Sequence, residues 1–230
     1  MEALTGVKAC VFDAYGTLFD TASAARRSAE LLGDKAGPLA ALWREKQLAY
    51  TWLRAVQGRH ADFWQVTGDA LDFALEALAI DGPGLPDRPG LRDRLMQLYL
   101  TLDPYPEVPE MLRRLRAAGL KTAILSNGTP RMLEALVAGA GLEFDALLSV
   151  EQAGVYKPHA SVYQLALDTL GLPARAIAFQ SSNGWDAYGA SAFGMQVVWC
   201  NRSRQPRERL PGAPDREIDT LAALPDLVGA

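Results

Sequence analysis

Residues that cross-link small proteins or bind metals are scarce in this sequence. Its 230 residues include two cysteines, Cys10 and Cys200, and two histidines, His60 and His159. Two cysteines are too few for a disulfide scaffold, and each lies in an apolar run, so we expect buried free thiols. Neither histidine belongs to an HExxH or CxxC pattern, so the sequence predicts no zinc site.

Long apolar runs and an excess of basic residues are also missing. No window approaches the roughly 18 apolar residues of a membrane span, so no membrane partner is predicted. Residues 1–8 lack the basic and then apolar regions of a secretory signal, so we expect a cytoplasmic protein. Lysine and arginine number 23 against 27 aspartates and glutamates, a net charge of −4. Because phosphate backbones select for clustered basic residues, this balance argues against a nucleic-acid partner.

The remaining composition is that of an ordinary soluble globular protein, with 49% apolar and 22% charged residues. After residue 104, short apolar runs alternate with helical segments. We expect strands at residues 7–12, 120–125, 146–150, 176–179 and 195–200, and helices at 107–118, from 129 onward, at 158–170 and at 184–193. This alternation predicts an α/β fold with a doubly wound parallel sheet. The polar stretch 202–216 is expected to be a surface loop.

Residues 21–102 have a different character, because apolar residues recur there at helical spacing. The repeat includes Leu39, Leu42, Trp43, Ala49, Leu53 and Val56. Glycine and proline clusters at residues 33–38 and 82–90 are expected to separate the helices. The sequence therefore predicts a helical cap subdomain at residues 19–102, inserted into a core formed by residues 1–18 and 103–230.

Polar residues follow four of the expected strands. Asp13 ends the first, Ser126 and Asn127 end the second, Lys157 lies beyond the third, and residues 181–186 follow the fourth. Ligands of open parallel sheets bind beyond the carboxyl ends of the strands, so these side chains are expected to share one crevice. Each has an alternative reading as a turn, cap or solvated residue. Their coincidence at four strand ends favours a site.

Four segments resemble the sequence motifs of the haloacid dehalogenase superfamily. Residues 11–20 resemble its nucleophile motif, with Asp13 as the nucleophile. Residues 125–128 resemble the second motif, Lys157 and Pro158 the third, and residues 181–186 the fourth. The four motifs occur in order, and the resemblance covers nearly the whole chain, including the cap. It implies a Rossmann-like core.

Two positions distinguish branches of that superfamily. Its phosphatases carry a second aspartate two residues after the nucleophile, where this chain has Tyr15, and an acidic residue early in the fourth motif, where it has Ser182. Mg²⁺ prefers carboxylate ligands, so both replacements argue against a metal-dependent phosphatase. The pattern instead resembles the L-2-haloacid dehalogenases, as do residues 42–54 of the cap. Glu45 and Gln180 depart from the family pattern.

The resemblance implies that short (S)-2-haloalkanoic acids are hydrolysed to (R)-2-hydroxy acids and halide, without cofactor or metal. Asp13 would attack the α-carbon and form an ester. The halide would be received by Arg44, Asn127 and Trp185, and the substrate carboxylate by Ser126 and the backbone near Ala14 and Tyr15. Lys157 would offset negative charge, with Tyr163 supporting it. The ester and its attacking water would be oriented by Thr17, Ser181, Asn183 and Asp186. The pocket would be walled by Tyr15, Leu48, Phe63 and Trp185.

Other readings of the same residues stay open. One is a phosphatase of the same superfamily, and another is a non-catalytic member that binds a small acid or a partner protein. Asp13, Lys157 and Asp186 together favour an enzyme, because a binding module needs no nucleophile. The resemblance also implies a homodimer.

Overall fold

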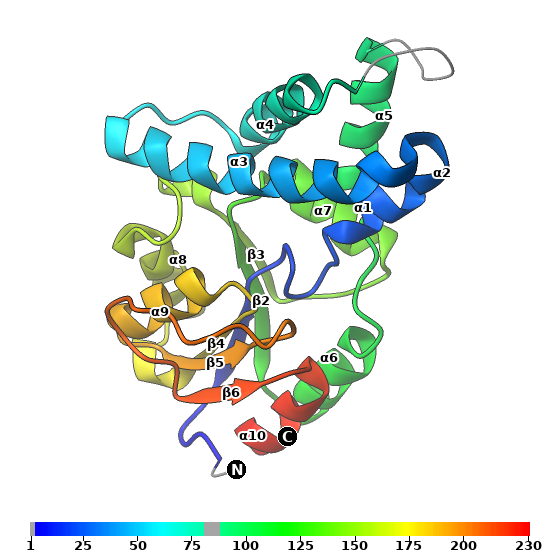
Figure 1. Ribbon diagram of the computed structural model, residues 1–230. Coiled ribbons are helices and arrows are strands. Elements are labelled where there is room, and N and C mark those ends of the chain that lie inside the picture. The colour runs from blue at the N-terminus through cyan, green and yellow to red at the C-terminus, as the bar shows by residue number, and fades with distance from the viewer. Residues whose placement is uncertain (1–2, 81–87) are drawn as a thin grey trace.

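A parallel β-sheet forms the centre of the molecule in the computed structural model, which describes residues 3–80 and 88–230. Its six strands follow the order β3-β2-β1-β4-β5-β6 (Figure 1). All neighbouring strands pair in parallel, which confirms the predicted fold class. The strands are β1 (Ala9–Phe12), β2 (Lys121–Ser126), β3 (Ala146–Ser149), β4 (Ile177–Ser181), β5 (Gln196–Cys200) and β6 (Arg216–Ile218).

The central strand shows why this sheet is buried on both faces. All four residues of β1 are apolar and buried, as expected where helices cover both sides of a parallel sheet. Helices α8 and α9 lie on one side, and α6 and α10 on the other (Figure 1). The core helices are α6 (Val108–Ala117), α7 (Pro130–Gly139), α8 (Ala160–Leu170), α9 (Gly184–Phe193) and α10 (Leu224–Val228).

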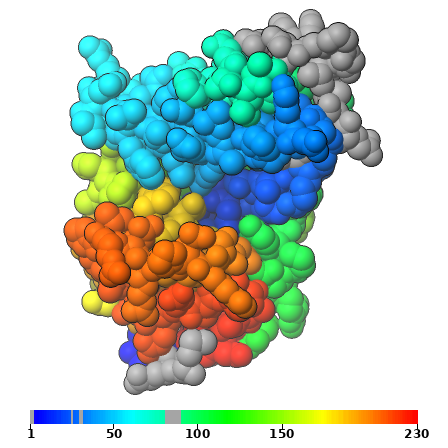
Figure 2. All heavy atoms as spheres, viewed as in Figure 1, coloured from blue at the N-terminus to red at the C-terminus, as the bar shows by residue number. Residues whose placement is uncertain are grey.

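A layer of helices lies over the carboxyl edge of the sheet (Figure 1). It comprises α1 (Ala22–Arg27), α2 (Ala29–Leu32), α3 (Ala36–Gln57), α4 (Phe63–Ala77) and α5 (Arg88–Tyr99). We call this layer the cap. In the space-filling view its blue and cyan atoms rest directly on the core (Figure 2). The cap therefore covers the edge where parallel sheets bind ligands.

The two segments that join cap and core run side by side. The Asp20 amide donates to the Asp103 carbonyl at 2.8 Å, and the Tyr105 amide donates to the Leu18 carbonyl at 2.9 Å. These bonds lie where the sequence predicts the cap to begin and end. The exact domain boundaries stay a prediction.

Several expected elements need correction. The break expected at residues 33–38 is present but shorter, because residues 33–35 separate α2 from α3. Gly37 and Pro38 lie in the first turn of α3, where a proline is tolerated because no backbone donor is needed. Of the other expected break, residues 82–87 lie outside the described residues and Gly90 lies in α5. Leu53 and Val56 are 56% and 87% exposed rather than core residues.

The stretch expected to be a loop also ends differently. Arg216 is the first residue of β6, which pairs with β5 through Val198. This edge strand has three residues, of which one is apolar, so its hydropathy pattern is too short to predict a strand from the sequence. The preceding residues 202–215 contain no helix or strand.

Both cysteines are buried free thiols, as expected. Burial raises the pKa of the Cys10 thiol to about 12, so it is protonated and unreactive at neutral pH. Among the described helices, none combines the length and apolar content needed to cross a lipid bilayer.

Candidate active site

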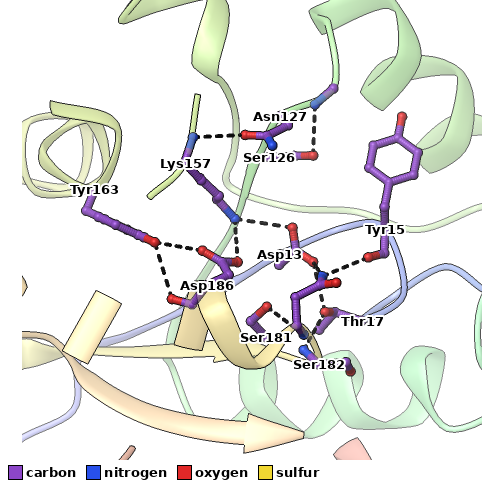
Figure 3. A network of polar contacts seen from close by, with 12 residues as sticks. Asp13, Tyr15, Thr17, Ser126, Asn127, Lys157, Tyr163, Ser181, Ser182 and Asp186 are labelled. Carbon is purple, nitrogen blue, oxygen red and sulfur yellow. Dashed lines mark hydrogen bonds and ion pairs between the residues drawn. The ribbon is translucent and has the colours of Figure 1, made fainter. Parts of the chain in front are cut away.

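Asp13 follows β1 and lies at the centre of a hydrogen-bonded network (Figure 3). Its side chain is buried, and three donors hold it. Lys157 Nζ lies 3.2 Å from Oδ1, while Thr17 Oγ1 and Asn183 Nδ2 donate to Oδ2 at 3.0 and 2.9 Å. Both carboxylate oxygens are therefore fixed in place. The structure brings together residues separated by up to 170 positions in the sequence.

Lys157 bridges two carboxylates in the interior. Its ammonium is fully buried and lies 3.2 Å from Asp13 Oδ1 and 2.9 Å from Asp186 Oδ2. Burial alone would lower the pKa of Lys157, but the two carboxylates outweigh this effect and raise it. The ring of Phe179 lies 5.0 Å from Nζ. Lys157 is thus held as a cation that offsets the charge of Asp13 and Asp186.

Asp186 lies in the first turn of α9 and is completely buried. Tyr163 donates its hydroxyl to Oδ1 at 2.8 Å, and Lys157 binds Oδ2 (Figure 3). Burial raises the pKa of the Asp186 carboxyl, an effect that Lys157 opposes. Tyr163 therefore supports the lysine region through Asp186 rather than by touching Lys157 itself.

The loops after β1 and β4 are tied together beside Asp13. The Ser182 amide donates to Thr17 Oγ1 at 2.8 Å, and the Asn183 amide donates to Ser181 Oγ at 3.2 Å. Asn183 Nδ2 also donates to the Tyr15 carbonyl at 3.1 Å. Thr17 and Asn183 each contact both Asp13 and the opposite loop, so they fix the geometry around the carboxylate.

The loop after β2 approaches from the other side. The Gly128 amide donates to Ser126 Oγ at 3.1 Å, which leaves the serine hydroxyl proton available for a ligand. Asn127 Oδ1 accepts a hydrogen bond from the Lys157 amide at 3.2 Å. A Cβ at Gly128 would lie 2.9 Å from the ring of Tyr15, so only glycine fits this close approach. The second loop is thereby packed against Tyr15.

Aromatic rings form one wall of the site. Tyr15 is buried, stacks on Tyr99 with ring centroids 5.5 Å apart, and packs at a tilt against Phe63, at the start of α4, at 5.6 Å. Burial raises the pKa of the Tyr15 hydroxyl well above its usual value, and within the described residues that hydroxyl has no hydrogen-bond partner. Tyr15 is therefore a neutral wall residue. Ala14, beside it, is completely buried and its carbonyl accepts amides of the following turn.

Two further residues expected to wall the pocket, Trp185 and Leu48, are only partly buried. Trp185, in α9, packs edge-on against Trp52 of the cap at 5.4 Å. Leu48, in α3, is partly exposed to solvent.

The cap contributes one cation to the network. Arg44 of α3 donates through Nη2 to Asn183 Oδ1 at 3.2 Å and through Nη1 to Gln47 Oε1 at 2.7 Å. Because Asn183 in turn binds Asp13, the guanidinium lies one residue away from the candidate nucleophile. Arg44 was expected in the site from its sequence motif, whereas Gln47 and Tyr99 were not. The spacing of three residues between Arg44 and Gln47 places them on one helix face and could have indicated the pair.

The donor set does not fit a divalent metal. Within the described parts of the chain, no group of three or more His, Cys, Asp or Glu side chains could hold one. The carboxylates of Asp13 and Asp186 are instead joined by Lys157. Tyr15 and Ser182 supply no carboxylate at the two positions where one would be needed.

Comparisons with known proteins agree in one family. A family model for haloacid dehalogenase-like hydrolases matches residues 7–194. An (S)-2-haloacid dehalogenase of Pseudomonas sp. (strain YL) is 46% identical over 223 residues, which cover 96% of this chain and 94% of that protein. A solved dehalogenase structure has a TM-score of 0.93 at 42% identity, covering 98% of this chain and 99% of that one. The L-2-haloacid dehalogenase from Xanthobacter autotrophicus with chloropropionic acid covalently bound has a TM-score of 0.88 at 41% identity, covering 96% and 98%.

Proposed function

The chain belongs to the haloacid dehalogenase-like hydrolases, and we propose that it hydrolyses short (S)-2-haloalkanoic acids to (R)-2-hydroxy acids and halide. The reaction passes through an ester on Asp13. The observation that carries this proposal is the set of contacts around Asp13. Three donors fix its carboxylate, while the aromatic side chain of Tyr15 stands where a phosphatase needs its acid. A halide leaves without a proton, so no such acid is needed.

The first step is displacement at the α-carbon. One oxygen of Asp13 forms a bond to that carbon, and the carbon–halogen bond breaks with its electron pair on the halide. Arg44 receives the halide together with Asn127 and Trp185, because a guanidinium is always charged and weakly hydrated. Ser126 and the backbone near Ala14 and Tyr15 hold the substrate carboxylate. In-line displacement inverts the α-carbon, which gives the (R) product from the (S) substrate.

The second step returns the enzyme to its starting state. Water attacks the carbonyl carbon of the Asp13 ester, the hydroxy acid leaves, and one proton is released overall. Thr17, Ser181 and Asn183 orient the ester. We assign the proton of the attacking water to Asp186, since burial raises the pKa of that carboxyl and it lies against the same ammonium as Asp13. Lys157 offsets the negative charge that develops on the ester carbonyl.

A paired assay tests this function against its rivals. Halide release from L-2-chloropropanoate is measured without added metal, beside phosphate release from p-nitrophenyl phosphate with Mg²⁺. We expect halide release only, and its loss in Asp13→Asn, which keeps the size of the side chain but not its nucleophilicity. Phosphate release alone would identify a phosphatase. Failure of both reactions would indicate a non-catalytic member that binds a small acid.

A related structure supports the covalent route. The Xanthobacter autotrophicus enzyme has been solved with chloropropionic acid covalently bound, and it shares the fold over 96% of this chain. Asp13 is the buried carboxylate at the end of β1 whose two oxygens both face donors from neighbouring loops. This supports Asp13 as the residue that would carry the ester in this chain.

A further inference from the structure

Gln47 is a buried amide in the cap that the proposed mechanism does not use. It lies in α3, is 0% exposed, and has all its polar atoms bonded. Nε2 donates to Thr67 Oγ1 at 2.8 Å, while Oε1 accepts from Arg44 Nη1 at 2.7 Å and from the Tyr99 hydroxyl at 3.1 Å. Burying an amide is costly unless it is hydrogen-bonded, and here three cap helices supply the partners. An apolar residue would fill the same space without this requirement.

The direction of each hydrogen bond can be worked out from Thr67. Its hydroxyl donates to the Phe63 carbonyl at 2.6 Å. A hydroxyl has a single proton, so Thr67 can only accept from its other neighbour. The nitrogen of the Gln47 amide must therefore face Thr67, and its oxygen must face Arg44. The network thus fixes the amide in the one orientation that presents an acceptor to the guanidinium.

This acceptor sets the position of Arg44. Gln47 Oε1 holds Nη1, and the guanidinium then extends from the cap so that Nη2 reaches Asn183 Oδ1 at 3.2 Å. An amide oxygen is neutral, so it orients the guanidinium without cancelling its charge. A carboxylate in the same place would form an ion pair and weaken the attraction for an anion. Orientation with the full charge retained is what a halide-receiving group needs.

We propose that Gln47 is a positioning residue that holds Arg44 in the geometry that receives the departing halide. The proposal rests on the proposed function, in which Arg44 performs that role. Gln47 touches neither the substrate nor the halide. It acts on the displacement step alone, because ester hydrolysis does not involve the halide.

Two substitutions separate orientation from charge. Gln47→Met keeps the length of the side chain and removes the acceptor, while Gln47→Glu keeps an acceptor and adds a negative charge beside Arg44. Thr51→Val is the matched control, since Thr51 is also buried in α3, one turn further on, and its hydroxyl donates to the Leu48 carbonyl of the same helix at 2.7 Å. Thermal melts establish that each variant is folded.

Single-turnover halide release is the main measurement. We expect Gln47→Met to slow halide release by up to roughly 10²-fold, since displacing a reacting or stabilising group by about 1 Å can lower the rate by that factor. Gln47→Glu should slow it further, because its carboxylate would form an ion pair with Arg44 and could not donate to Thr67 Oγ1 as the amide nitrogen does. KM should change little. The rate of halide release should fall more for 2-chloropropanoate than for 2-bromopropanoate, because chloride is the poorer leaving group. Thr51→Val should match the wild type.

The decisive comparison uses Arg44→Ala as a background. If Gln47 acts through Arg44, adding Gln47→Met to Arg44→Ala should cause no further loss, whereas a purely structural residue would lower the rate in both backgrounds. Equal losses in both backgrounds would overturn the proposal, as would a wild-type rate in Gln47→Met and Gln47→Glu. A wild-type rate in Arg44→Ala would instead remove Arg44 from the site, and so contradict the proposed function itself.

Discussion

Replacing Lys157 by methionine tests the charge balance at the centre of the site. Lys157 is fully buried and its ammonium bridges Asp13 and Asp186. Methionine fills similar space without charge, so two carboxylates would remain in the interior with no cation between them. Breaking a buried ion pair by removing one partner costs about 3–5 kcal/mol. For a chain of this size that corresponds to a fall in Tm of about 6–20 °C.

The loss should depend on pH in a direction that the structure fixes. In the wild type, Lys157 opposes the rise that burial imposes on the pKa of Asp186. Without the ammonium this pKa rises further. A carboxyl whose pKa is raised in the folded state contributes stability at low pH and loses it as the pH rises through that folded value. Between pH 5 and pH 7 the variant should therefore lose up to about 2.7 kcal/mol relative to the wild type, or 1.36 kcal/mol per pH unit.

Thermal melts followed by circular dichroism at pH 5 and pH 7 measure this difference. The contribution of Lys157 itself is constant across that range, because its raised pKa lies above its usual value near 10.5. Lys8→Met, an exposed lysine just before β1, is the control for loss of one positive charge. A Tm difference between Lys157→Met and the wild type that stays equal at both pH values would refute the reasoning, as would a variant as stable as the wild type.

Other predictions concern the reaction and the packing around it. Arg44→Lys should lower kcat by roughly 10²-fold, because lysine is more strongly hydrated and lacks the planar donor fork; turnover near the wild-type value would remove Arg44 from the site. EDTA should leave dehalogenation unchanged, and a loss restored by Mg²⁺ would show that the enzyme needs a metal although Tyr15 and Ser182 supply no carboxylate. In a single turnover in H₂¹⁸O with enzyme in excess, the hydroxy acid should carry mainly ¹⁶O and Asp13 should gain the label, whereas fully labelled product would make Asp13 a general base. Gly128→Ala should raise KM by displacing Tyr15, which a Cβ would approach to 2.9 Å, and an unchanged KM would show that the Tyr15 ring yields freely.

The core could be predicted from the sequence because its signals are local. Short buried strands such as β1 alternate with helices, and polar residues lie at or beyond the carboxyl ends of β1, β2, β3 and β4. The rule that parallel strands bind ligands at their carboxyl ends then places Asp13, Lys157 and Asp186 together without any knowledge of side-chain contacts. The start of α7 could also be predicted from the sequence, since Thr129 Oγ1 caps the helix and Pro130 is its first residue.

The cap was harder to predict, because its details depend on packing between helices distant in sequence. Leu53 and Val56 continue the apolar spacing of α3, yet they extend past the core and stay exposed. Nothing in the sequence indicates that Tyr99, 52 positions away, donates to Gln47. Helical periodicity assigns a residue to a face, but only the packed structure shows which neighbour that face meets.

The two adjacent segments that join cap and core also have a consequence for how the protein can evolve. Because the cap leaves and re-enters the core at backbone positions joined by hydrogen bonds, residues 20 and 103, its two ends lie close together, which is the geometry that tolerates insertion of a unit into a fold. Asp13, Lys157 and Asp186 lie in the core, whereas Arg44 lies in α3 of the cap. On the proposed function, the residues for nucleophilic attack and the residue that receives the halide are thus encoded in separate stretches of the gene. Each can be altered by mutation or recombination while the other is preserved.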